Sequence, residues 1–251
     1  MNYDSLLITT TEIGFQLLKN GAETYRVEDS VTHVLKAYSD NIADINVFAI
    51  PTCLIISITT KDHITYTKTK RILNRLQNID RIVKINSLCR YITDNKPDIS
   101  YIDEQLELIG NLKRYPFPFE LFASCLTASV FTLFFKGSVL DAFLSVIIAI
   151  LVKANTTVLK NFKMNFFTTI IFNSFIIAAI AVLSYRVGLP VHYDSIIIGC
   201  FMLLVPGVAI TNSARDFIAG DLLSGTLRLF EAFLIATFIA LGSGIALALL
   251  R

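Results

Sequence analysis

The sequence predicts two domains of different classes: a cytoplasmic α+β domain over residues 1–114, then an all-α membrane domain of five transmembrane helices over residues 115–251. The first observation is the distribution of charge. Residues 115–251 contain 14 charged side chains, whereas residues 1–114 contain 28, divided evenly between acids and bases. The second observation is a series of five long apolar runs, all in the C-terminal part. We therefore expect a domain of ordinary soluble composition joined to a membrane domain.

The five apolar runs are the predicted membrane spans. They cover residues 119–135, 139–152, 166–185, 195–210 and 229–250. A bilayer core about 30 Å thick is crossed by roughly 20 apolar residues of helix, which satisfies its own backbone hydrogen bonds. The third and fifth runs reach this length. The second has only 14 residues and depends on Lys136 and Lys153, whose side chains can extend to the membrane surface.

The Lys and Arg residues near the spans predict the orientation. With the first domain in the cytoplasm, the inner side receives seven of them and the outer side three. The inner group is Lys113, Arg114, Lys153, Lys160, Lys163, Arg215 and Arg228, and the outer group is Lys136, Arg186 and Arg251. The positive-inside rule thus predicts a multi-pass protein of the cytoplasmic membrane, with the N-terminus inside and the C-terminus outside.

Within the first domain, hydrophobic periodicity predicts a helical hairpin followed by three strands. The expected helices cover residues 3–19, 23–38 and 101–112, and the expected strands cover residues 46–50, 54–60 and 64–69. Gly21 is expected to end the first helix as a C-cap. Residues 72–76 and 82–91 fit a strand and a helix equally well.

The composition favours neither an enzyme nor a metalloprotein. Four widely spaced cysteines are expected to be buried thiols in a reducing compartment: Cys53, Cys89, Cys125 and Cys200. His33 and His63 lack partners at metal-ligand spacing, so we expect no metal and no cofactor. No nucleophile or phosphate-binding motif is present, and a net charge of +2 is too small to indicate nucleic acid.

The fourth apolar run is interrupted by Pro206 and Gly207. Proline cannot donate to the helical ladder, so an apolar helix broken here exposes backbone groups at membrane depth. Transporters place substrate and ion sites at such discontinuous helices. Polar residues follow at once, and with two further acids they are the expected substrate or proton pathway: Pro206, Gly207, Asn212, Arg215, Asp216, Asp221, Arg228, Glu231 and Asp141.

Each polar residue has an alternative interpretation. The charged residues 215, 216, 221 and 228 could form a solvated cytoplasmic loop held by salt bridges. Asp141 follows Ser138 and could cap a helix. Asp216 and Asp221 share a face only if Gly220 bends the chain.

A second charged cluster lies in residues 21–29 of the first domain. Its motif residues are Gly21, Glu23, Arg26, Glu28 and Asp29. The simpler interpretation is a solvated first turn with pairs such as Glu23 with Arg26, each worth a few tenths of a kcal/mol.

Three stretches resemble the threonine/serine exporter family, in particular its N-terminal half: GAETYRVEDSV from residue 21, PTCLIIS from residue 51 and PGVAITNSARDFIAGDLLSGTLRLFEA from residue 206. The resemblance implies a cytoplasmic domain with five spans, and proton-driven export of small amino acids, or of dicarboxylates such as succinate in two-component members. Fused members carry a second block of five spans, so it also implies a second membrane subunit, or a homo-oligomer. By position, the family's marked residues are those of the two clusters above, with Gly220 and Gly225.

Two rival functions remain open from the sequence. A membrane-embedded hydrolase would use Glu23, Glu28, Asp29 and His33, and would need these groups to converge in a pocket of the soluble domain. A membrane-anchored sensor would bind its ligand in the soluble domain, and its helical bundle would contain no polar cavity.

Overall fold

The computed structural model describes residues 3–38, 40–73, 76–112 and 115–250. Contacts divide the chain into two compact units. We call Met1–Lys113 with Thr211–Arg228 the N-terminal unit, and Arg114–Ile210 with Leu229–Arg251 the helical unit. The sequence division at residue 114 assigns residues 211–228 to the membrane domain, whereas their contacts group them with the N-terminal unit. The division into a soluble and a membrane domain stays a prediction.

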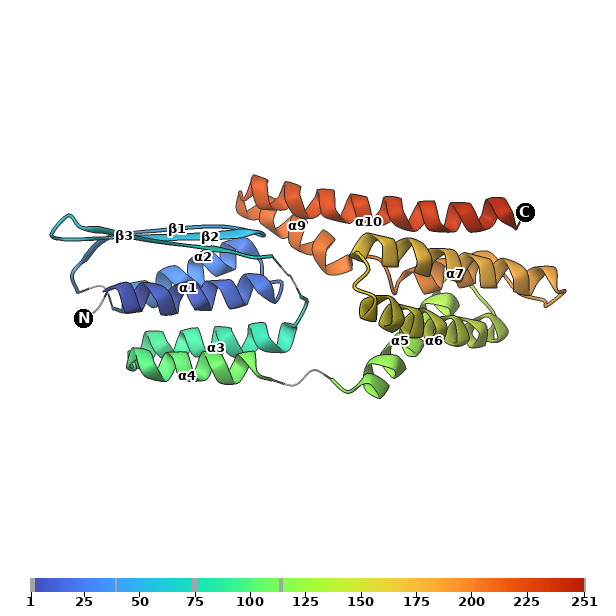
Figure 1. Cartoon of the computed structure of the whole chain (residues 1–251), viewed down its shortest axis with the longest axis horizontal. Helices are drawn as coiled ribbons and strands as arrows, with labels where there is room; N and C mark the ends of the chain where they lie inside the picture. Colours follow the sequence, from blue (N-terminus) through green and yellow to red (C-terminus); the bar gives the residue numbers. More distant parts are fainter. Residues whose placement is uncertain (1–2, 39, 74–75, 113–114, 251) are drawn as a thin grey trace. The chain divides into compact units, whose positions relative to one another are not determined.

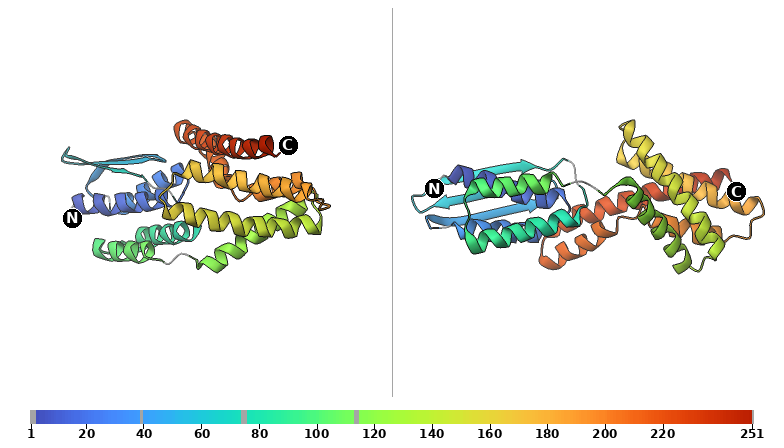
Figure 2. Two further views of the ribbon diagram at one scale, coloured as in Figure 1. Left: turned by 45° about the vertical axis from the view of Figure 1, so that its right-hand side comes forward. Right: turned by 90° about the horizontal axis from the view of Figure 1, so that it is seen from below.

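The N-terminal unit has three layers, in which α1 and α2 lie between a sheet and a second helical pair (Figure 1). Its elements up to residue 110 are α1 (Tyr3–Lys19), α2 (Thr24–Ala37), β1 (Ile42–Ile50), β2 (Cys53–Thr60), β3 (Thr65–Arg71), α3 (Ile79–Asn95) and α4 (Ile99–Gly110). The strands are antiparallel in the order β1-β2-β3, with Ile50 opposite Cys53 at the first turn. The long axes of α3 and α4 run along the strands (Figure 2).

Alternating burial along β2 explains how the sheet attaches to the helices. Leu54, Ile56 and Ile58 are fully buried, and they join a core that includes Leu6 and Val31 from α1 and α2. Successive side chains of a strand point to opposite faces, so one apolar face of β2 lies against the helical hairpin. This core positions the N-terminus of α2, where the candidate site begins.

The helices and strands predicted for this unit are present, although most of their bounds differ. The first helix has the predicted bounds, and Gly21 follows it with φ of 95°, a conformation that glycine adopts without strain. The ambiguous residues 82–91 lie inside α3, whose N-cap Asn78 accepts a hydrogen bond from the Arg81 N–H at 3.1 Å. Residues 72, 73 and 76 belong to no helix or strand, and 74–75 lie outside the described residues.

All four cysteines are free thiols. Cys89 and Cys200 are buried, as predicted, whereas Cys53 and Cys125 are partly exposed. Burial raises the pKa of the Cys89 thiol to about 12, so this side chain packs as a small neutral group.

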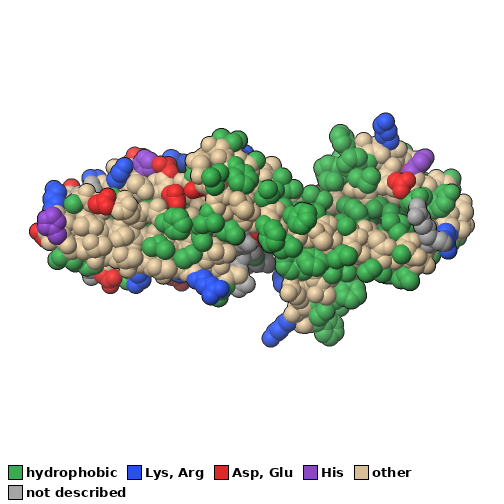
Figure 3. Space-filling view, turned by 90° about the horizontal axis from the view of Figure 1, so that it is seen from above, with side chains coloured by type: hydrophobic (Ala, Val, Ile, Leu, Met, Phe, Trp, Pro, Cys, Tyr) green, Lys and Arg blue, Asp and Glu red, His purple; other side chains and the backbone are tan. Residues whose placement is uncertain are grey.

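The helical unit contains most of the apolar surface. Its helices are α5 (Phe117–Phe134), α6 (Val139–Asn161), α7 (Phe166–Arg186) and α8 (Tyr193–Phe201), with the first residues of α9 (Gly207–Ala219) and most of α10 (Leu222–Leu249). Large apolar side chains such as Phe122, Phe143 and Phe233 are more than half exposed. On the face shown in Figure 3, hydrophobic side chains cover much of this unit, while most charged side chains lie on the N-terminal unit.

Four helices of the described chain are long and apolar enough to cross a membrane: α5, α6, α7 and α10. The predicted second span is longer than its apolar run of residues 139–152. It is α6, which has 23 residues and includes Lys153. The fourth predicted span, over residues 195–210, is not a continuous helix. Five transmembrane helices are therefore not confirmed.

The interruption of that run is confirmed and is wider than predicted. The first half, α8, ends at Phe201, five residues before Pro206, and α9 begins at Gly207. The chain between them turns tightly, since the Leu204 N–H donates to the Phe201 carbonyl at 2.8 Å. Proline at 206 has no N–H to continue the ladder, which explains why the second helix starts afresh.

Candidate functional site

Asp216 of α9 and Arg228 of α10 form a buried ion pair in the N-terminal unit. The Arg228 Nε lies 2.9 Å from the Asp216 Oδ2. Asp216 is 0% exposed and Arg228 only 6%, so water screens this pair little. The interpretation of these residues as a solvated loop is therefore wrong for both of them.

This pair holds the N-terminus of α2. The Thr24 N–H, at the first residue of the helix, donates to the Asp216 Oδ1 at 3.2 Å. The Arg228 Nη2 donates to the Ala22 carbonyl at 2.8 Å, and the Asn212 side chain donates to the Gly21 carbonyl at 3.0 Å. A carboxylate is favourable at a helix N-terminus because the orphan N–H groups carry partial positive charge. The two sequence clusters, far apart in the chain, thus meet at one place.

Glu23 connects the same helix start to α9 through Arg215, a more exposed partner. Its Oε1 accepts from the Arg215 Nη1 at 2.5 Å, and its Oε2 lies 3.6 Å from the Arg26 Nη1, the pair that the sequence suggested. Burial raises the pKa of Glu23, but hydrogen bonds from its own N–H and from Arg215, and the charges of Arg26 and Arg215, outweigh burial and hold the pKa below its usual value. Glu23 is thus an anion.

Three other carboxyl groups of the unit have the opposite shift. Burial raises the pKa of Asp216 above its usual value despite the charge of Arg228, and burial also raises the pKa of Asp221. Burial raises the pKa of Glu28 despite a hydrogen bond from the Ala49 N–H at 2.7 Å, and the charges of Asp221 and Asp216 add to the effect. Such groups bind protons more readily than exposed acids do.

Two glycines allow α9 and α10 to form a tight hairpin. Gly220 follows α9 with φ of 91°, and at this bend the Asp221 N–H donates to the Asp216 carbonyl at 2.8 Å. A Cβ at Gly225 would lie 2.7 Å from the ring of Phe217, too close for any other residue without a shift. The Ser213 hydroxyl donates to the Gly225 carbonyl at 2.8 Å and ties the two helices.

Asp29 does not join this network. It lies 3.2 Å from the ring of His33, and both side chains are mostly exposed. Asp29 and His33 line a surface cavity of about 420 Å³, whereas Glu23 and Glu28 do not line it. The four groups of the hydrolase alternative thus do not converge in the described structure.

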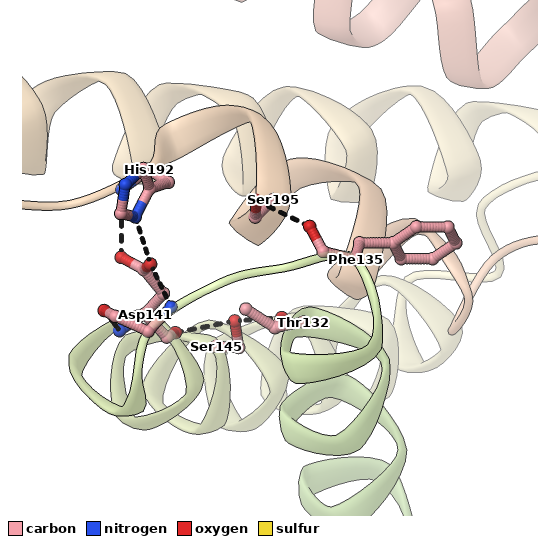
Figure 4. Close-up of polar contacts among 7 residues, drawn as sticks. Thr132, Phe135, Asp141, Ser145, His192 and Ser195 are labelled. Atoms are coloured by element: carbon pink, nitrogen blue, oxygen red, sulfur yellow. Dashed lines mark hydrogen bonds and ion pairs between the residues drawn. The ribbon is translucent and has the colours of Figure 1, made fainter.

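A second polar cluster lies in the helical unit around Asp141 (Figure 4). Asp141 is fully buried and forms a capping box with Ser138 at the start of α6, as the alternative interpretation predicted. Its Oδ1 accepts from the His192 N–H at 3.0 Å, and its Oδ2 lies 2.9 Å from the His192 Nδ1. His192 is a residue that sequence reasoning missed. It lies 51 positions away in a connecting segment, and no spacing links it to Asp141.

The remaining predicted residues are spread over the helical unit. Pro206 and Gly207 lie at the break, and Glu231 lies on α10 with intermediate exposure. Asn173 of α7 makes hydrogen bonds to α6, accepting from Asn155 and donating to Thr156, each at 2.8 Å. Within the described ranges, no group of three or more His, Cys, Asp and Glu could hold a metal ion.

Comparison with known proteins agrees with the resemblance seen in the sequence. The model of the ThrE family, described as "Putative threonine/serine exporter", matches residues 9–250. No curated protein and no solved structure matches the chain. The match covers nearly the whole chain, including both sequence clusters, and four helices are long and apolar enough to span a bilayer. This multi-pass membrane protein therefore belongs to the ThrE family of threonine/serine exporters.

Proposed function

We propose that this chain is a subunit of a secondary, proton-coupled exporter of the cytoplasmic membrane. Its substrates would be small amino acids such as threonine and serine, with dicarboxylates such as succinate as the alternative. The observation that carries the proposal is the interrupted apolar segment between Phe201 and Gly207, followed within nine residues by the buried Asp216. A break of this kind and a nearby protonatable acid are what a coupled transporter needs.

Asp216 is the best candidate for the coupled proton. Its ionised form pairs with Arg228 and accepts from the Thr24 N–H. A proton on Asp216 would remove the negative charge that pairs with Arg228 and so change the attachment of α9 to α2. Since α9 begins directly after the break, the proton would act on the same helix that starts there. Asp221 and Glu231 are the next candidates.

We also propose that a second membrane subunit completes the transporter, with a homo-oligomer as the alternative. Support comes from the family resemblance and from the exposed apolar side chains of the helical unit, which lipid or further helices would cover. The N-terminus would be cytoplasmic, from the excess of Lys and Arg on that side.

Transport in proteoliposomes tests the proposal. The chain is reconstituted with and without a co-purified membrane partner, and export of threonine, serine and succinate is measured under an imposed pH gradient. D216N and D221N should each remove most transport, because the amide keeps the shape but cannot carry the charge. D221N should keep expression and thermal stability near the wild-type level, whereas D216N leaves Arg228 buried without its anion and should also be less stable. K36Q, at an exposed lysine of α2 that is not among the predicted site residues, is the control.

Two results would count against the proposal. Normal export by both D216N and D221N would remove these acids from the mechanism. Export that is unaffected by collapse of the pH gradient would remove proton coupling.

A further inference from the structure

The helical unit contains a cavity of about 460 Å³ between α6, α7 and the chain at the break. Sites for small ligands usually have volumes of 300–1,000 Å³, so an amino acid or a dicarboxylate fits with room to spare. Leu203 and Leu204 of the break line the cavity, together with residues of α6 and α7. None of the residues predicted from the sequence to form the pathway lines it.

The polar lining of this cavity favours an anion. Lys153, Lys160, Thr156, Thr169 and Asn173 all contribute to it, and its lining contains no aspartate or glutamate. The Lys153 ammonium lies 2.8 Å from the Glu120 carboxylate, whereas Lys160 makes no ion pair among the described residues. Glu120 thus neutralises the charge of Lys153, whereas no described residue neutralises that of Lys160. A carboxylate is a natural partner for the second.

Hydrogen bonds hold part of the lining in place before any ligand enters. Asn173 is 2% exposed, and its amide is fixed on both sides by the side chains of Asn155 and Thr156. A group that is already oriented loses little entropy when a ligand binds. The Asn173 amide and the Thr156 hydroxyl are therefore held in place, and Thr156 lies between Lys153 and Lys160 along α6.

The cavity is separated from a second one, of about 500 Å³, near the other end of α7. Asn173 lines the first cavity and Val182 lines the second. At a rise of 1.5 Å per residue, these two residues are about 13 Å apart along the axis of α7. Ile177, Ala178 and Ala181 between them are fully buried. Packed apolar side chains thus divide two hollows, as a path that opens to one side at a time requires.

We propose that the cavity lined by Lys153 and Lys160, here called the Lys160 cavity, binds the carboxylate of a small organic anion and is the loading site of the exporter. This inference rests on the proposed function, in which the C-terminal end of α6 faces the cytoplasm. Because the lining offers cations and neutral donors but no acid, the cavity binds a dicarboxylate more tightly than a zwitterionic amino acid.

Direct binding to the purified full chain tests the site without transport. Succinate, serine and the uncharged butane-1,4-diol are titrated calorimetrically into the protein in a nonionic detergent. Succinate should bind most tightly, more weakly at higher salt, and the diol not at all. K160Q should weaken succinate binding about tenfold, as expected for the loss of one partly shielded ion pair. K163Q, three residues further on and outside the lining, should stay within twofold of wild type.

A second variant, T169V, tests the site in case K160Q does not fold. T169V removes one hydroxyl and keeps the side-chain shape, and it should weaken succinate binding about fivefold. Wild-type affinity in both K160Q and T169V would overturn the proposal. An equal loss in K160Q and K163Q would also overturn it, since a general positive charge at the helix end would then explain the binding.

An anionic lipid headgroup offers the same chemistry as a free carboxylate, so the titration is repeated in nanodiscs of phosphatidylcholine with and without phosphatidylglycerol. Succinate should bind in both, with at most a few-fold competition. Complete loss of succinate binding with phosphatidylglycerol would assign the cavity to lipid and overturn the proposal. Wild-type binding without export of any solute would instead refute the proposed function and leave the site standing.

Discussion

The two buried aspartates, Asp216 and Asp141, are stabilised by different kinds of partner. Both carboxylates face the N-terminus of a helix, that of α6 for Asp141 and that of α2 for Asp216, and both residues are 0% exposed. Asp141 is held by its own turn, through the capping box with Ser138, and by His192, which lies 51 positions away. Asp216 is held by two other helices, through Thr24 of α2, 192 positions away, and through Arg228 of α10.

This difference bears on function. A carboxylate that is satisfied by hydrogen bonds within its own turn stabilises that turn and little else. A carboxylate that joins three separate helices makes their packing depend on its charge. The network around Asp216 is therefore the better place for a switch driven by protons, and the cluster around Asp141 is the better anchor for a fixed helix end.

R228Q should lower the thermal stability more than any other variant. This change leaves the Asp216 carboxylate buried without its cation, and breaking a buried ion pair in this way costs about 3–5 kcal/mol. We expect a large drop in the thermal unfolding midpoint of the purified protein in detergent. The double variant D216N/R228Q should recover part of the loss, because no charge is left buried. R215Q, in a half-exposed pair, should cost about 0–1 kcal/mol. Equal losses in R228Q and R215Q would contradict the contrast between the pairs.

A smaller loss is expected for D141A, about 1–3 kcal/mol from the capping box and the bonds to His192. The loss should be local, so hydrogen exchange should increase at the first turn of α6 and stay unchanged in the N-terminal unit. S138A, which removes the other half of the capping box, is the matched comparison and should lose less. Faster exchange in α2 after D141A would show that the two clusters are not independent.

The pH dependence should also differ between the clusters. Glu28, Asp216 and Asp221 have raised pKa values in the folded protein. A raised carboxyl pKa stabilises the fold below the ordinary values of 4.5 and 3.8, and this contribution is lost as the pH rises through the raised values. Glu23, with a lowered pKa, contributes above its ordinary value and loses that contribution in acid.

We therefore expect the attachment of α9 to α2 to weaken as the pH rises above about 4 toward neutrality. Hydrogen exchange at Thr24 and the α9 amides, measured across this range, should report it. The double variant D216N/D221N should show a flatter profile than the wild type. A profile that is identical in the two proteins would remove these acids as the titrating groups.

The sequence predicted local structure far better than long-range contacts. The bounds of α1, the φ of Gly21 and the capping box at Asp141 all depend on neighbours within a few residues, and periodicity and spacing encode them. The pairing of residues 21–24 with residues 212–228 depends on how the chain folds back, and no local pattern carries that information. Only the family resemblance indicated that both stretches matter together.

The fourth apolar run shows a different limit. Hydrophobicity predicted a span, and Pro206 predicted a break, but not that the helix would already end at Phe201. The Lys160 cavity was missed for a related reason. Lysines at the end of an apolar run are also what the positive-inside rule expects, so sequence alone does not separate a topology signal from a binding site.

The smallest effect should come from H192Q, and it tests whether Asp141 depends on the imidazole. The His192 side chain is 66% exposed, so its pairing with Asp141 is largely screened by water. The backbone N–H of residue 192, which donates to the other carboxylate oxygen, remains in the variant. We expect a loss of less than about 1 kcal/mol in thermal unfolding and no change in hydrogen exchange at the start of α6. A loss as large as that of D141A would mean that the imidazole, rather than the capping box, holds this carboxylate, and Asp141 would then resemble Asp216 in depending on a distant partner.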